Sequence, residues 1–133
     1  MKNKKELLST IWIFVTLNYL YCDLIGLMDS NLLKQYLAGS VEGMTINENF
    51  LFYAGVLMEI PIAMILLSKI LSKKYNCWSN IFAGSTKTIV MCATLFMGNV
   101  TKYYLFFAVI EIATTIFVVV YAWKWLKQRE ELT

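Results

Sequence analysis

The sequence contains no histidine and a single proline, and only 16% of its 133 residues are charged. The absence of histidine removes the residue used most often as a general base and as a transition-metal ligand. The three cysteines, Cys22, Cys77 and Cys92, form no CxxC pair, so neither a disulfide framework nor a thiol-redox motif is indicated. We therefore predict buried apolar thiols, no metal, no cofactor and no catalytic residue.

Apolar sequence is what the chain has in excess. Hydrophobic residues make up 59% of it, whereas a soluble domain is about 45–50% apolar and about 25% charged. No glycine- or serine-rich linker divides the chain, and its length predicts a single domain over residues 1–133. This composition favours an integral membrane protein, and we expect no nucleic-acid partner.

Four segments are long and apolar enough to cross a bilayer, which takes about 20 residues each. The sequence predicts spans at residues 7–28, 50–71, 78–98 and 103–125. The predicted fold is therefore an all-α integral membrane four-helix bundle. The first segment follows the basic stretch MKNKKE, as in a signal peptide, but it is too long for one and no small-residue cleavage site follows. We interpret it as a retained span.

Basic residues gather on one side of the predicted bundle, which sets its orientation because lysine and arginine favour the cytoplasmic side. That side holds both termini and the connection between the second and third spans, with Lys2, Lys4, Lys5, Lys69, Lys73, Lys74, Lys124, Lys127 and Arg129. The opposite side holds only Lys34 and Lys102. We predict a multi-pass protein of the inner (cytoplasmic) membrane, in contact with membrane lipid, with both termini cytoplasmic.

The one long connection runs from Asp29 to Asn49. Its first half, DSNLLKQYLAG, predicts a short helix that Asp29 or Ser30 caps and Gly39 ends. We predict that this helix lies on the outer membrane surface, between the first two spans. The alternative is a lid over the outer opening of the bundle.

Five polar residues fall within the predicted spans: Asn18, Asp23, Glu59, Lys87 and Glu111. A charge at the centre of a membrane helix costs about 2.5–3.5 kcal/mol on insertion scales, and such residues usually face the bundle interior. Gly55 and Ala63 flank Glu59 by one turn on either side, which supports an inward orientation for that carboxylate. Pro61 follows and predicts a kink that widens the bundle.

These charges lead to a functional hypothesis, because the carboxylates outnumber the lysine. A low-dielectric site then needs a proton or a bound cation. We predict that an intramembrane cluster of Glu59, Lys87 and Glu111 binds or passes a small cationic or amphipathic ligand. Asp23, Asn18 and Tyr19 complete the predicted ligand-binding set. Four helices make a narrow bundle, so a transporter of this kind would be a homo-oligomer.

Two other hypotheses remain open. The first is a membrane enzyme that modifies a lipid or an isoprenoid, with two carboxyl groups as acid and base. The absence of histidine, of a nucleophile motif and of a metal-binding pattern favours a non-enzymatic protein. The second is an accessory or assembly subunit in which the ionic cluster is purely structural.

The segments NYLYCDLIGLMD, LLKQYLAG, LMEIPIAMILLS and IEIATT support a resemblance over nearly the whole chain. The sequence resembles a family of small bacterial four-span membrane proteins of unknown function. Its overall plan is also similar, less specifically, to the DoxX-like group of four-helix membrane proteins. The resemblance implies an integral inner-membrane protein and brings no activity, cofactor or catalytic residue.

Overall fold

The computed structural model describes residues 4–41, 44–96 and 100–128, and helix dominates them. The helices of this part are α1 (Lys4–Met28), α2 (Ser30–Ala38), α3 (Glu48–Ile70), α4 (Lys73–Leu95) and α5 (Lys102–Lys127). A short antiparallel hairpin follows α2 and consists of β1 (Ser40–Val41) and β2 (Met44–Thr45). The hairpin was not predicted, because strands of two residues carry no alternation that a sequence pattern could reveal.

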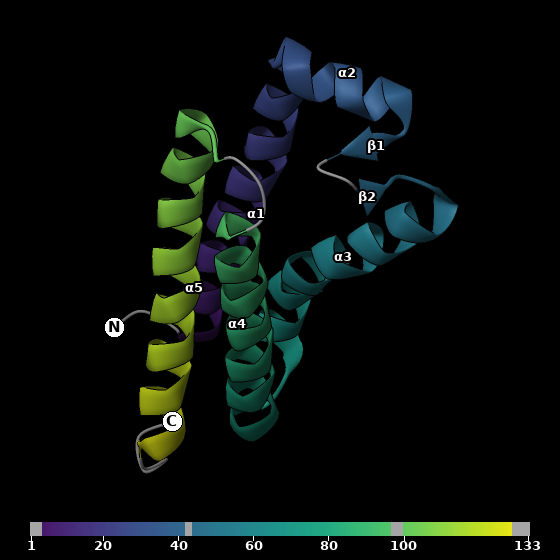
Figure 1. Ribbon diagram of the computed structural model, residues 1–133. Coiled ribbons are helices and arrows are strands. Elements are labelled where there is room, and N and C mark those ends of the chain that lie inside the picture. The colour runs from purple at the N-terminus through teal and green to yellow at the C-terminus, as the bar shows by residue number, and fades with distance from the viewer. Residues whose placement is uncertain (1–3, 42–43, 97–99, 129–133) are drawn as a thin grey trace.

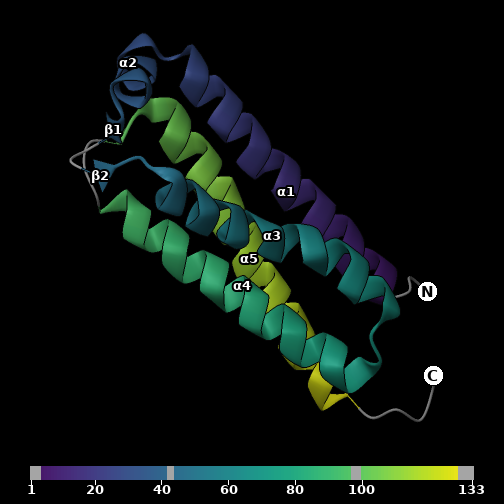
Figure 2. The same cartoon turned by 90° about the vertical axis from the view of Figure 1, so that its right-hand side faces the viewer.

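The four long helices form a bundle, and α2 lies across one end of it (Figure 1). The first residues of α1 and the last residues of α5 lie at the opposite end, as two views of the molecule show (Figures 1 and 2). We call the end that carries α2 and the hairpin the α2 end, and the other the terminal end. The start of α1 and the end of α5 therefore share one end of the bundle, and their cytoplasmic placement stays a prediction.

Local signals set the bounds of α2 as the sequence predicts. The carboxylate of Asp29 accepts hydrogen bonds from the backbone amides of Asn31 and Leu32, at 3.0 and 3.5 Å, and so caps the helix. Gly39 ends α2 in the left-handed conformation, with φ of 83°, which glycine adopts without steric cost. The predicted short helix is confirmed.

Within the described residues, α1, α3 and α5 are long and apolar enough to cross a membrane, which indicates membrane association. The fourth long helix, α4, has 23 residues like α3 but falls short in hydropathy. The reason is its buried face, which is largely polar or small: Asn76, Cys77, Asn80, Ala83, Gly84, Lys87 and Met91. The predicted all-helical bundle is thus confirmed, and composition supports three of its four predicted spans.

Several predictions fall partly outside the described residues. These are the basic residues Lys2 and Arg129, used for the orientation, and residues 97–98 of the third predicted span. The described bounds of the long helices otherwise lie within a few residues of the predicted spans.

The bundle packs most closely between α4 and α5. Gly84 allows this approach, because a Cβ atom at its position would lie 2.7 Å from Val119 Cγ2 and 3.1 Å from the Thr115 carbonyl oxygen. The hydroxyl groups of Thr88 and Thr115 are 2.7 Å apart and join the two helices by a hydrogen bond. Small and hydroxyl residues of this kind allow close helix contact inside a membrane.

By contrast, α3 is only partly packed. Its buried residues are Pro61, Met64 and Ser68, all in its second half. The first half leans away from α4 (Figure 1). Pro61 lies inside the helix and is buried, and the kink expected at this position stays a prediction.

Candidate functional site

The structure brings four of the predicted site residues together around α1. Lys87 reaches from α4 to Tyr19 of α1, and its ammonium nitrogen lies 4.3 Å from the centroid of the ring. Glu111 of α5 is 1% exposed and Lys87 is 3% exposed. Both are close enough to Asp23 of α1 to interact with it electrostatically. A cation over an aromatic face is stabilised by the ring quadrupole, most strongly where water is excluded.

Some oxygen atoms in this buried region lack a partner. Glu111 Oε2 and the hydroxyl groups of Tyr19 and Thr16 form no hydrogen bond within the described part of the chain. A buried polar group without a partner costs about 1–3 kcal/mol. These atoms therefore favour a molecule or a proton that the polypeptide itself does not supply.

Two other predicted residues do not join this group. Asn18 is half-buried, and its amide nitrogen donates to the Phe14 carbonyl oxygen of the same helix at 2.9 Å. Glu59 is exposed on α3, on the face opposite the buried Pro61 and Ser68. The prediction that Glu59 faces the bundle interior beside Lys87 is therefore wrong. The prediction rested on Gly55 and Ala63. Small residues indicate that a helix face can be approached closely, but they do not indicate which partner approaches it.

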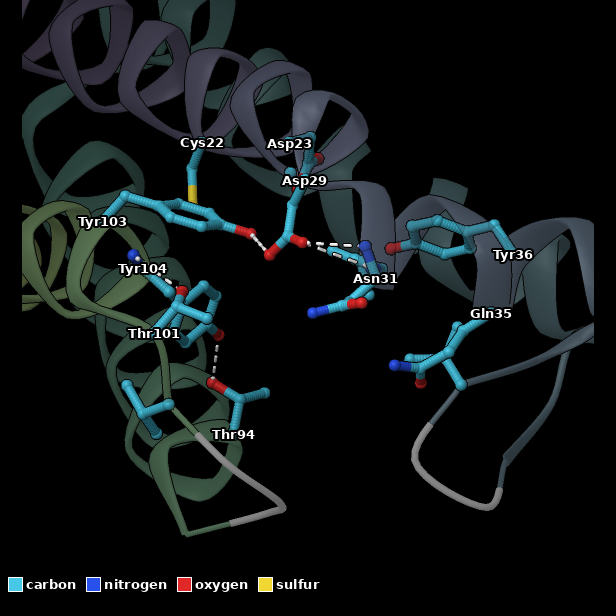
Figure 3. A pocket seen from close by; sticks show the side chains of 14 residues that line it. Cys22, Asp23, Asp29, Asn31, Gln35, Tyr36, Thr94, Thr101, Tyr103 and Tyr104 are labelled. Atoms are coloured by element: carbon cyan, nitrogen blue, oxygen red, sulfur yellow. Dashed lines mark hydrogen bonds between the residues drawn. The ribbon is translucent and has the colours of Figure 1, made fainter.

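A pocket of about 640 Å³ lies at the α2 end of the bundle, and Asp23 is the member of this group that lines it (Figure 3). Cys22, Asp23 and Asp29 lie along one side of it, and Tyr103 and Tyr104 flank them. The facing wall comes from α2 and includes Asn31, Leu32, Gln35 and Tyr36. The volume lies within the range of about 300–1,000 Å³ that small-molecule sites occupy.

The two carboxylates of the pocket differ in their hydrogen bonding. Asp29 caps α2 and accepts a further hydrogen bond from the Tyr103 hydroxyl at 3.1 Å, so its charge is compensated by donors. Asp23 is exposed and has neither a hydrogen bond nor an ion pair with any described residue. Asp23 is thus the carboxylate of this pocket that remains available to a ligand.

Aromatic side chains surround these carboxylates. The Tyr104 hydroxyl donates to Thr94 Oγ1 at 2.7 Å and fixes its ring against α4. Burial, and after it the nearby carboxylate of Asp23, raises the pKa of the Tyr36 phenol above its ordinary value. No lysine or arginine occurs among the described residues that line the pocket. Negative charge beside aromatic rings is the chemistry that recognises organic cations.

A second polar group lies toward the terminal end and has a different character. The Trp12 indole nitrogen donates to Asn80 Oδ1 at 2.6 Å, and the Asn80 amide donates to Asn76 Oδ1 at 2.7 Å. Asn76 in turn donates to the Ser68 carbonyl oxygen at 2.7 Å. All four side chains are fully buried. Because its donors and acceptors satisfy one another, this network joins α1, α3 and α4 and has no need of a ligand.

A comparison with protein-family models matches residues 1–132 to DUF6326, a family of unknown function. The chain belongs to the DUF6326 family. No curated protein and no solved structure matches it. The predicted resemblance to a family of unknown function is confirmed, whereas the DoxX-like plan and the bacterial origin stay predictions.

Sequence reasoning missed most of the pocket of this DUF6326 protein. Asp29 was identified only as a helix cap, and Tyr36, Tyr103 and Tyr104 were not among the predicted ligand-binding residues. Tyr103 and Tyr104 lie in the first turn of α5, which begins at the α2 end of the bundle. Their position in the sequence, at the outer start of a predicted span, could have indicated them as pocket residues. Of the two readings of α2, its contribution to the pocket wall favours the lid.

Proposed function

We propose that this protein spans a membrane with four helices and that its α2 end binds a small organic cation with an apolar part. The single observation that carries the proposal is the make-up of the pocket. Its described lining contains two carboxylates and three tyrosines and lacks any basic residue. The positive charge of a ligand would lie beside Asp23, and its apolar part would lie against the rings of Tyr36, Tyr103 and Tyr104.

The proposal includes α4 as a span although its hydropathy is low. Its polar face is buried against the other helices, where Asn76, Asn80 and Lys87 are not in contact with lipid. Polar residues that face a bundle interior are the usual exception in membrane helices. With both termini cytoplasmic, the α2 end is on the outer side, and the pocket opens toward the medium.

The residues beneath the pocket add to its preference for a cation. Cys22 lines the pocket and lies close enough to Glu111 to interact with it electrostatically. Together, Asp23, Glu111 and Lys87 carry an excess of negative charge when ionised. Lys87 compensates one of the two negative charges. A ligand cation in the pocket would compensate the other.

The experiment compares two probes of the same shape that differ in charge. Benzyltrimethylammonium is a cation, and neopentylbenzene is its uncharged carbon analogue. Binding to the folded protein raises its melting temperature, because ligand binding stabilises the native state by mass action. We expect benzyltrimethylammonium to raise the melting temperature of the detergent-solubilised protein and neopentylbenzene to have a much smaller effect.

Two variants with the same change in charge locate the site. Asp23→Asn should abolish the effect of the cationic probe, because it removes the unpaired carboxylate of the pocket. Glu59→Gln should leave that effect unchanged, because Glu59 lies on α3 away from the pocket lining. Equal stabilisation by both probes, or equal loss in both variants, would contradict the proposal.

A further inference from the structure

Glu59 has an unusual position for a carboxylate. It is the middle residue of α3, with 23 residues between Glu48 and Ile70, and α3 is one of the helices apolar enough to cross a membrane. At about 1.5 Å per residue, it lies about 16 Å from either end of the helix. If α3 spans the bilayer, as proposed above, the carboxyl group of Glu59 is near the bilayer centre.

The monomer leaves this group uncovered. Glu59 is exposed, and no described residue forms a hydrogen bond or an ion pair with it. A charged residue that faces lipid at this depth is energetically costly, and such residues almost always face protein. Lys87, the cation of the neighbouring α4, is buried against Tyr19 instead. The structure therefore calls for a further protein surface on this face of α3.

The residues around Glu59 form a largely exposed stripe, in which Ala63 alone is half-buried. Phe52, Gly55, Leu66 and Ile70 lie within about 40° of it on the helix circumference, at about 100° per residue. All four are exposed, and a Cβ atom at Gly55 would meet nothing within 4 Å. A glycine one turn from the polar group gives a second helix room to approach closely.

We infer that this stripe of α3 is the contact surface for a second copy of the chain, with the two Glu59 carboxyl groups hydrogen-bonded to each other at the two-fold axis. The inference rests on the proposed membrane placement of α3. Two copies related by an axis along the membrane normal place the same residue at the same depth. A pair of carboxyl groups that shares one proton is self-complementary, as like charges so close do not both ionise. A different protein would have to supply a matching group at that depth.

The test uses photo-crosslinking in the membranes of expressing cells. Benzoylphenylalanine replaces Leu66, about two helical turns from Glu59 on the same face, in a chain co-expressed with a second, differently tagged copy. Val109 of α5 is the matched control position, because it is 59% exposed and Leu66 is 60% exposed. We expect an adduct that carries both tags from Leu66 and little from Val109. An adduct with another protein, or with lipid alone, would overturn the inference.

Substitutions of Glu59 then test the carboxyl pair. Glu59→Gln should keep the doubly tagged adduct, because two amides also hydrogen-bond to each other, whereas Glu59→Leu should reduce its yield about fivefold. Unchanged yield in Glu59→Leu would refute the role of the pair. Thermal unfolding of the Glu59→Leu monomer should match that of the wild type, which excludes misfolding as the cause of a loss.

Carbonate extraction of the same membranes checks the premise separately. Retention of the chain in the pellet supports the membrane placement, and its release would overturn both that placement and this inference. Benzyltrimethylammonium binds, by the proposal above, in the pocket at the α2 end and not at the Glu59 face. An absence of binding would therefore contradict the proposed function and would not affect the crosslinking test.

Discussion

The ammonium nitrogen of Lys87 lies 4.3 Å from the centroid of the Tyr19 ring. Lys87 is the one buried cation among the described residues, and α4 holds it against α1 in this way. Glu111 and Asp23 are near enough to influence the same ammonium electrostatically, but no ion pair forms between described residues here. The cation is thus held by an aromatic face and by charge at longer range. This arrangement has measurable consequences for each partner.

The first concerns the balance between Lys87 and Glu111. Lys87→Met removes the positive charge and leaves the buried carboxylate of Glu111 without compensation, so we expect the free energy of unfolding to fall. Glu111→Gln in the same chain should restore part of the loss, because it removes the uncompensated charge. A double-mutant cycle measured by thermal unfolding in detergent should give a coupling of about 0.5–3 kcal/mol. Additive effects would show that the two residues act independently.

The second concerns the Tyr19 hydroxyl, which has no hydrogen-bond partner in the described part of the chain. Tyr19→Phe keeps the ring under Lys87 and removes the unsatisfied oxygen, so the free energy of unfolding should stay within about 0.5 kcal/mol of wild type or rise. Tyr19→Leu removes the ring and should lower it by about 1–2 kcal/mol. A strong loss in Tyr19→Phe would mean that a bound water or ligand uses the hydroxyl.

A third prediction concerns a different part of the bundle, the buried hydrogen-bond network at the terminal end. Asn80→Ala leaves the Trp12 indole and the Asn76 amide oxygen without their buried partner, and the expected cost is about 2–4 kcal/mol. Asn18→Ala is the matched control, because Asn18 is half-buried and donates only within its own helix. Its effect should stay below about 0.5 kcal/mol. Denaturant unfolding followed by circular dichroism measures both, and equal losses would contradict the assigned role of the network.

Local features of the fold could be predicted from the sequence because they depend on few residues. The cap at Asp29 and the end of α2 at Gly39 follow from neighbouring atoms alone. The long helices follow from their apolar length. The same apolar character hides how each helix is rotated, since a membrane helix is hydrophobic on its lipid side and on its packed side.

Glu59 and Glu111 illustrate this limit. Both lie in the pattern of two apolar residues, glutamate and isoleucine, at similar depths of their helices. Glu111 is buried and Glu59 is exposed. The two glutamates differ because α3 packs against α1 mainly through its second half, while the first half of α3 is turned outward. No local sequence pattern indicates that packing. The pocket was missed for the same reason, because five separate elements converge to form it.

The last prediction concerns the closest helix contact in the bundle. Gly84→Ala would place a methyl group 2.7 Å from Val119 Cγ2 and 3.1 Å from the Thr115 carbonyl oxygen, and the backbone oxygen has no freedom to move away. We expect α4 and α5 to separate slightly, at a cost of about 1–3 kcal/mol.

Gly55→Ala, measured on the dilute detergent-solubilised monomer, is the control for this substitution. Nothing lies within 4 Å of the added methyl group at that position, so its unfolding should be unchanged or shifted slightly upward by the better helix propensity of alanine. Amide hydrogen exchange provides a second readout. Separation of α4 from α5 would break the Thr88–Thr115 hydrogen bond and should speed exchange in both helices of the Gly84→Ala variant alone. Equal exchange in the two variants would mean that the bundle absorbs the methyl group without opening this contact.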